Sequence, residues 1–371
     1  MTKKTLIVLG ALTLVAIVLA FAATRGQPRI EATDQAGQVL FPRMVNDIDK
    51  LKSVVIKHSG ETLTIDWDGK VFRMRERGGY LVEAEKVQAL AVRLARLSKL
   101  ERKTAQADRY DRLDLGDPAA KGGQATQLTL QDAGGKAIAD VIVGKRKFTL
   151  GGREGGTYVR LPGDPQTWLA LGELMVGTAA HDWLKTDIAD IKGDTIKRVT
   201  VTHANGDKVA ASLGPNNAFT LENIPRGMEM VTPSTGDDFR KLLEALKLDD
   251  VAQASTVTFP KDRTTTAVFE GVDGFQITLE TFDDNGKYWI RLKGSAPADR
   301  ADAAKLVADL NARTEAWAFP VPQYAIVPLT KSMNDLVKKP DPQGARPAMP
   351  QGMPGGMPGG LPPGFMAPPR P

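Results

Sequence analysis

The feature that most constrains the fold is a strand pattern that occurs twice in the chain. Residues 51–58 (LKSVVIKH) align with residues 196–203 (IKRVTVTH), and a glycine-containing turn follows each stretch, at Ser59-Gly60 and at Asn205-Gly206. Alternation of apolar and polar residues is typical of a strand with one buried face. A similar segment recurring far along the chain predicts an internal duplication.

The elements around the first copy predict a β-meander, a helix and further strands. Short alternating runs predict strands at 53–58, 62–66, 70–74, 127–130, 138–143 and 157–160, with turns at Asp68-Gly69 and Gly134-Gly135. Between them, Val87, Leu90, Leu94 and Leu97 recur at helical spacing, and charged residues fill the other face. This is the pattern of an amphipathic helix packed on one side of a sheet.

The second copy begins a similar order of elements. Strands are expected at 208–211, 219–221, 265–269, 275–282 and 287–292, with hairpin turns at Asp273-Gly274 and Asn285-Gly286. A helix is expected to carry Phe239, Leu242, Leu243 and Leu246 on its apolar face, capped by Thr232 or Ser234, and another helix is expected at 301–311.

These elements predict an α+β fold with two repeated lobes of antiparallel β-meanders, each packed with one amphipathic helix. The expected boundaries are 40–180 for the first lobe, 181–193 for the joint and 194–337 for the second lobe. Such halves form either two lobes or one pseudo-symmetric body with a cleft. Residues 338–371 repeat Pro, Gly and Met, a composition that predicts a disordered tail.

The N-terminus predicts export to or across a membrane. Residues 1–4 form a basic, cytoplasmic n-region, and the uncharged run 5–23 would be about 28 Å long as a helix, close to the thickness of a bilayer core. We expect a transmembrane signal anchor followed by a linker at 24–39. A cleavable signal peptide is the alternative, because Ala20-Phe21-Ala22 has the form of a cleavage site, but the run is longer than a signal core.

Composition excludes several classes of chemistry. The chain has no cysteine, which removes disulfides, thiolate metal sites and cysteine nucleophiles. Its formal net charge of +5 comes from interspersed charges, which does not indicate a nucleic-acid partner. His58, His181 and His203 have no second ligand at a useful spacing. We therefore expect no catalytic residue, no metal and no cofactor.

Two groups of residues are candidates for a binding surface. Lys145, Arg146 and Lys147 form a basic run, expected at a hairpin end, that could meet anionic lipid or an acidic partner, although such a run is more often a plain solvated loop. Trp168, Trp183 and Trp289 could be ligand platforms, although large aromatic residues more often serve as anchors in a core or at a lobe joint.

Several short motifs together resemble domain-of-unknown-function family 4340. They are Leu40-Phe41-Pro42, residues 158–163, Asp182-Trp183-Leu184 with Asp187-Ile188, and Trp317-Ala318-Phe319 followed by Pro322 and Tyr324. The similarity covers roughly residues 40–337 and brings no catalytic residue with it. It implies a bacterial protein of the inner membrane, with most of the chain in the periplasm, from a family whose members are often encoded beside ABC-type transport components of the gliding-motility auxiliary kind.

The function expected from these features is a non-enzymatic accessory subunit of an ABC-type envelope complex. Its partners would be the inner membrane and an ABC-type permease or auxiliary envelope protein. The alternative is a glycan- or peptide-binding module that uses a cleft between the lobes, lined by exposed aromatics such as Trp168 or Trp289. A hydrolase would require clustered polar residues with perturbed pKa values in one pocket.

Overall fold

A computed structural model describes residues 35–150 and 155–340. The expected anchor at 5–23 and nearly all of the expected tail lie outside the described residues. Within the described part, no helix combines the length and apolar character needed to cross a membrane.

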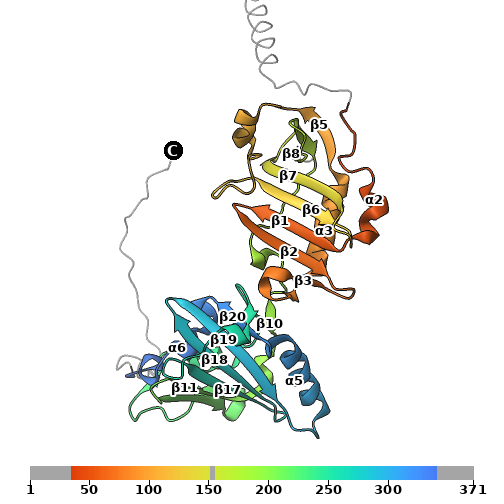
Figure 1. The fold of residues 1–371 in the computed structure, drawn as a ribbon. Coiled ribbons are helices and arrows are strands. Elements are labelled where there is room, and N and C mark those ends of the chain that lie inside the picture. The colour runs from red at the N-terminus through yellow and green to blue at the C-terminus, as the bar shows by residue number, and fades with distance from the viewer. Residues whose placement is uncertain (1–34, 151–154, 341–371) are drawn as a thin grey trace, which may run out of the picture.

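The first lobe is built on one antiparallel sheet (Figure 1). Its order is β4-β3-β2-β1-β6-β7-β8-β9-β5. The strands are β1 Ser53–His58, β2 Glu61–Trp67, β3 Phe72–Met74, β4 Tyr80–Leu81, β5 Ser98–Arg102, β6 Thr126–Gln131, β7 Ala137–Lys147, β8 Gly156–Arg160 and β9 Thr167–Leu171. The expected strands of this lobe are present, and β4, β5 and β9 are additional to them.

Helix α3 Ala84–Arg96 supplies much of the first lobe's core. Val87, Leu90 and Leu94 are buried on one face, as the periodicity predicts, and they join a cluster with the inward residues of the sheet. The short helix α2 Met44–Asp47 adds Met44, whose side chain is fully buried. Outside this core, the 3₁₀ segment η3 Ala107–Leu113 lies over β7 and β8 with a small cluster of its own.

The second lobe is built on another antiparallel sheet, of order β13-β12-β11-β17-β18-β19-β20-β16. Its strands are β11 Ile196–Thr202, β12 Lys208–Leu213, β13 Phe219–Leu221, β16 Ala252–Gln253, β17 Thr265–Gly271, β18 Gln276–Asp284, β19 Lys287–Ser295 and β20 Trp317–Val321. The two-stranded pair β14 Glu229–Met230 and β21 Val337–Lys338 lies apart from it. The hairpin dipeptide Asn285-Gly286 joins β18 to β19 with positive φ at both residues, as this turn chemistry requires.

Helices α4 and α5 pack on the second lobe, together with the short helix α6 Val327–Thr330, and α7 Met333–Leu336 follows α6 in the chain. Helix α5 Ala301–Thr314 packs on β19, where Gly294 leaves room for Val307: a Cβ on Gly294 would lie 3.0 Å from that side chain. Helix α4 Thr235–Arg240 packs against β13, and a Cβ on Gly236 would meet the Phe219 carbonyl oxygen at 1.9 Å. The expectation of one helix per lobe is therefore too simple for this half.

The predicted helix through Leu246 is wrong in its extent. Helix α4 ends at Arg240, the chain turns with a positive φ at Ala245, and Leu246 begins β15 Leu246–Lys247. Phe239, Leu242, Leu243 and Leu246 are nevertheless all buried. A turn can bury apolar residues at helical spacing, so the periodicity alone did not locate the helix end. Ser234 occupies the N-cap position without a side-chain hydrogen bond to the helix.

The lobes are joined by a strand-like segment that belongs to both. Val82 and Leu184 form an antiparallel bridge, flanked by hydrogen bonds from the Glu83 amide to the Trp183 carbonyl (2.9 Å) and from the Lys185 amide to the Leu81 carbonyl (3.0 Å). The chain then continues into β10 Asp187–Ala189, which pairs with β15. The edge of the first sheet is thus tied by backbone hydrogen bonds to the segment that enters the second lobe.

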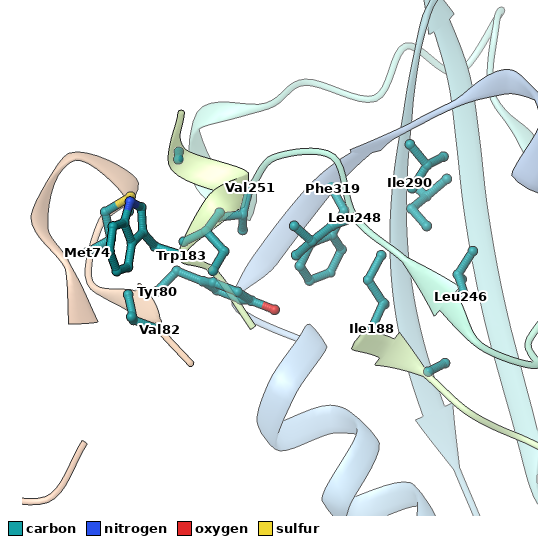
Figure 2. Packing of buried hydrophobic residues seen from close by; sticks show 14 of the residues in the cluster. Met74, Tyr80, Val82, Trp183, Ile188, Leu246, Leu248, Val251, Ile290 and Phe319 are labelled. Carbon is teal, nitrogen blue, oxygen red and sulfur yellow. The ribbon is translucent and has the colours of Figure 1, made fainter. Parts of the chain in front are cut away.

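Apolar side chains from both lobes meet at this joint (Figure 2). The ring of Tyr80 packs edge-on against Trp317 and Phe319, with centroid distances of 5.0 and 6.0 Å. Beside them, Arg77 donates two hydrogen bonds to the Asp250 carboxylate, at 2.5 and 3.0 Å. Tyr80 is only 4% exposed, and burial raises the pKa of its hydroxyl to about 12.

The raised pKa of Tyr80 predicts a loss of stability in alkali. In the unfolded chain the hydroxyl ionises near pH 10, so its contribution is complete below pH 10 and is lost as pH rises to about 12. Between pH 10 and pH 12 we expect the free energy of unfolding of the wild-type protein to fall by roughly 2–3 kcal/mol more than that of Tyr80→Phe, measured by urea unfolding at each pH. Parallel pH profiles for the two proteins would contradict this.

Candidate functional site

A groove with a volume of about 900 Å³ lies in the first lobe. Helices α2 and α3, the 3₁₀ turn η1 Ile48–Lys50 and the strands at the β4 edge enclose it. Its apolar lining comprises Met44, Val45, Ile48, Leu51, Trp67, Val71, Phe72, Leu81, Val82, Ala84, Val87, Ala91, Val92 and Ala95. A concave, apolar-lined hollow of this size is typical of a binding site.

The rim of the groove exposes apolar surface. Val45 on α2 is 69% exposed and Val92 on α3 is 49% exposed, although both adjoin buried residues of the same helices. Deeper in the groove, Trp67 and Phe72 pack with ring centroids 4.8 Å apart. Large aliphatic side chains left open beside an apolar hollow are a feature of surfaces that bind another apolar surface.

A tight turn shapes one end of the groove. The Asp68 carboxylate accepts hydrogen bonds from the backbone amides of Val71 (2.9 Å) and Lys70 (2.8 Å), and from the Arg73 guanidinium (2.6 Å). These contacts lower the pKa of Asp68 to about 2. The carboxylate therefore stays ionised at neutral pH and holds Lys70 and Val71 at the groove's edge.

Charges of both signs border the apolar lining. Asp49, Glu83 and Glu85 supply the acidic groups, and Lys52, Lys70, Arg96 and Lys185 supply the basic ones. No nucleophile–base pair lies among the lining residues of the described chain. This arrangement suits recognition of an amphipathic segment, whose apolar face enters the groove and whose charges pair at the rim.

A second, polar recess lies between the lobes. Its volume is about 510 Å³, and its lining consists of Glu61, Thr62, Leu63, Glu76, Arg77, Thr178, Ala179, Ala180, His181, Asp249 and Asp250. No tryptophan, tyrosine or phenylalanine lines it within the described residues. The Glu76 carboxylate accepts a hydrogen bond from the Thr64 amide at 2.7 Å, a structural role. The aromatic lining that a glycan- or peptide-binding cleft was expected to show is absent from this recess.

Trp168 and Trp183, two of the candidate binding residues, are buried, which is the position expected of anchors in a core or at the joint. Their side chains are 5% and 4% exposed, and the Trp183 indole donates a hydrogen bond to the Gly177 carbonyl at 2.9 Å. Trp168 lies in β9, with the Lys99 ammonium 4.6 Å from its ring centroid. Trp289 is half-buried in the second lobe, with Lys287 over its ring. The three side chains share no surface.

The basic run lies at the end of β7, beside the connection that joins β7 to its antiparallel partner β8. Lys145, Arg146 and Lys147 complete β7, and Arg146 and Lys147 pair with β8. The Lys145 ammonium donates to the Arg112 carbonyl at 3.0 Å and pairs with Asp114 at 3.6 Å. Arg146 lies over the ring of Phe148. This run and the three tryptophans are therefore not assembled into one site.

The histidines occupy separate, local settings. His58 contacts the hydroxyl of Thr126 (3.0 Å), and His203 contacts the Lys331 carbonyl (3.2 Å). His181 lies 3.2 Å from its neighbour Asp182. Within the residues that the structure describes, no three His, Cys, Asp or Glu side chains are grouped as a metal site would require.

The groove was missed by sequence reasoning because its walls come from separate segments. Met44 and Ile48 precede the first strand, Trp67 and Phe72 flank a turn, and Val92 lies off the buried stripe of α3. Val92 was the one available signal: an apolar residue on a face that periodicity assigns to solvent.

Comparison with known proteins places the chain in a family. A family model described as Domain of unknown function (DUF4340) matches residues 67–268, more than half of the 371 residues. The chain belongs to this family. The match begins at Trp67 on the groove and ends in β17, so this DUF4340 region spans the joint and parts of both sheets. Neither a curated protein nor a solved structure matches the chain.

The placements of the tryptophans predict different costs of truncation. Trp183→Ala removes a buried side chain at the joint, and we expect it to lower the free energy of unfolding by about 3–5 kcal/mol. Trp289 is only half-buried on β19, so Trp289→Ala should lower the free energy of unfolding by less than about half of that amount. Urea unfolding of both variants measures the difference. Equal losses would contradict the assignment of Trp183 as a joint anchor.

Proposed function

We propose that this DUF4340 protein is a non-enzymatic accessory subunit of an ABC-type envelope transport complex, anchored in the bacterial inner membrane by residues 5–23 and facing the periplasm. It acts by holding an amphipathic helix of a partner protein, an ABC-type permease or auxiliary protein, in the first-lobe groove. The observation that carries the proposal is the apolar groove of about 900 Å³ with exposed aliphatic residues at its rim.

The dimensions of the groove support a helical occupant. Helix α3, which forms one wall, has 13 residues and a length of about 20 Å, so a partner helix of similar length could lie along it. Helix-in-groove recognition uses apolar anchors at successive turns, and the mixed charges at the rim would set the direction of binding. Lys70, Lys185 and Glu85 among the lining residues could take part in this pairing.

We also infer that the two lobes descend from one duplicated unit. Sheet order supports this: β3-β2-β1-β6-β7-β8-β9-β5 in the first lobe matches β13-β12-β11-β17-β18-β19-β20-β16 in the second, strand for strand in chain order. The aligned segments 51–58 and 196–203 contribute β1 and β11, the equivalent strands near the centre. The groove then distinguishes the first lobe from the second, as expected where one copy keeps a binding role.

The partner is tested by cross-linking from the groove. Gln88 is exposed and lines the groove, so a photo-reactive residue there should cross-link the full-length, membrane-extracted protein to an ABC-type permease subunit. Adding Val45→Asp and Val92→Asp should reduce the cross-link at least about tenfold, because charges at the rim would have to be desolvated. Mass spectrometry of the cross-linked product measures both results.

The control places the same charges outside the groove. Val231 and Val272 in the second lobe are 41% and 50% exposed, so Val231→Asp with Val272→Asp matches the change without touching the lining. This control should cross-link like the parent protein. Recovery of the protein with no permease-like partner, or equal loss in both double variants, would refute the proposed function.

A further inference from the structure

A hollow bordered by arginines lies at the end of the first lobe opposite the joint. It measures about 600 Å³ and is lined by Lys103, Thr104, Ala105, Gln106, Arg109, Arg112, Leu113 and Gln166. Its cations come from the chain just after β5 and from η3. Arg102, the last residue of β5, reaches its rim by donating a hydrogen bond to the Gln166 side-chain oxygen at 2.5 Å.

The wall of this hollow is held by hydrogen bonds. Gln166 is 8% exposed, and its amide donates to the carbonyl oxygens of Thr167 (2.8 Å) and Lys103 (3.2 Å). Lys103 is also paired with the carboxylate of Glu101. The Tyr110 hydroxyl ties η3 to the chain before β9 by donating a hydrogen bond to the Pro165 carbonyl at 2.6 Å. The positions from which the arginines project are therefore fixed by the fold.

The arginines themselves are available to an anion. Arg102, Arg109 and Arg112 are exposed, and none has a carboxylate within 4.0 Å among the described residues. The lining of the hollow contains no acidic residue of the described chain. Asp108 and Asp111 lie on η3 beside the arginines and reduce the net charge of the region. Guanidinium groups bind phosphate oxygens in a bidentate manner, so phosphate is the chemistry that this hollow fits.

The hollow lies where the N-terminal segment reaches the lobe. Strand β5 is the sheet edge opposite β4, and residues 35–39 run along it, with the Gly37 amide donating to the Lys99 carbonyl at 2.7 Å (Figure 1). The backbone of residues 24–34 extends at most about 40 Å. With residues 5–23 in a bilayer, the β5 edge would thus stay within about 40 Å of the membrane surface, near enough for the arginines to reach it.

We propose that Arg102, Arg109 and Arg112 bind the phosphate headgroups of anionic phospholipids and seat the β5 end of the first lobe on the bilayer. The inference rests on the proposed membrane anchor. The anchor supplies proximity, and the arginines supply orientation: the β4 edge, the groove beside it and the second lobe then project away from the membrane. Basic groups near an anionic bilayer are attracted in a salt-dependent manner.

The test uses a single label, because the chain has no cysteine of its own. Gln106→Cys places a fluorophore at the exposed lining of the hollow. The full-length protein is reconstituted into phosphatidylcholine vesicles with or without about a quarter phosphatidylglycerol, both containing lipids with a nitroxide at the headgroup. We expect quenching of the label only with the anionic lipid at about 0.05 M salt, and its relief at about 0.5 M.

Substitutions distinguish a specific effect of the three arginines from an effect of the protein's overall positive charge. Each arginine should contribute about fivefold to the ratio of docked to undocked protein. The triple variant Arg102→Gln, Arg109→Gln and Arg112→Gln should therefore lower this ratio by on the order of 100-fold. Lys208→Gln with Arg226→Gln and Lys261→Gln removes the same charge from the second lobe and should leave quenching unchanged. Free inorganic phosphate should compete only at concentrations that act as salt.

Four outcomes would overturn the inference. Equal quenching with and without anionic lipid, or equal loss in both triple variants, would show that the arginines do not bind headgroups while leaving the anchor and the groove untouched. Competition by micromolar phosphate would identify a soluble phosphate ligand instead of lipid. Recovery of the full-length protein outside the vesicles would remove the anchor, and with it both the seating and the membrane part of the proposed function.

Discussion

The structure depends on one contact between its lobes: the apolar packing of Tyr80 from the first sheet against Trp317 and Phe319 of the second. Each large apolar side chain buried there contributes about 1.5–3 kcal/mol, more than an exposed ion pair supplies. The antiparallel bridge between Val82 and Leu184 also orients the lobes, because strand pairing fixes the direction of the two backbone segments as well as the distance between them. A flexible linker alone would leave the two sheets free to reorient.

The joint and the groove share residues, which ties the proposed binding site to the relation between the lobes. Leu81, Val82 and Lys185 line the groove, and the same three residues take part in the pairing that leads into the second lobe. A partner helix seated against Val82 would therefore rest on the segment that positions the second sheet. In the proposed function, the second lobe would stabilise and orient a site that the first lobe carries.

Local chemistry in the sequence predicted much of the fold. Asn285-Gly286, with both residues at positive φ, and the apolar stripe Val87, Leu90 and Leu94 were read correctly because each signal is contained in one short segment. Strand β9 was missed because Thr167–Leu171 is buried on both faces and shows no alternation. Its position between β8 and β5 is a long-range property that no local pattern expresses.

The candidate sites were harder to predict than the fold. Trp168 and Trp183 are conspicuous in the sequence, yet burial of their rings is what the fold requires of them. The groove and the arginine hollow both arise where segments distant in sequence meet, as at Met44 with Val87 and at Lys103 with Gln166. Pattern reading assigns a residue to a face of its own element, and it does not identify which elements will face each other.

The central claim, that packing of Tyr80 against Trp317 and Phe319 fixes the relative orientation of the two lobes, is tested most directly by electron–electron resonance between two spin labels. Lys57→Cys in β1 and Lys208→Cys in β12 place the labels on exposed positions of the two sheets in a chain otherwise free of cysteine. The account predicts a single narrow distance distribution that broadens when Tyr80→Ala is added. A broad distribution in the parent protein, unchanged by Tyr80→Ala, would contradict it.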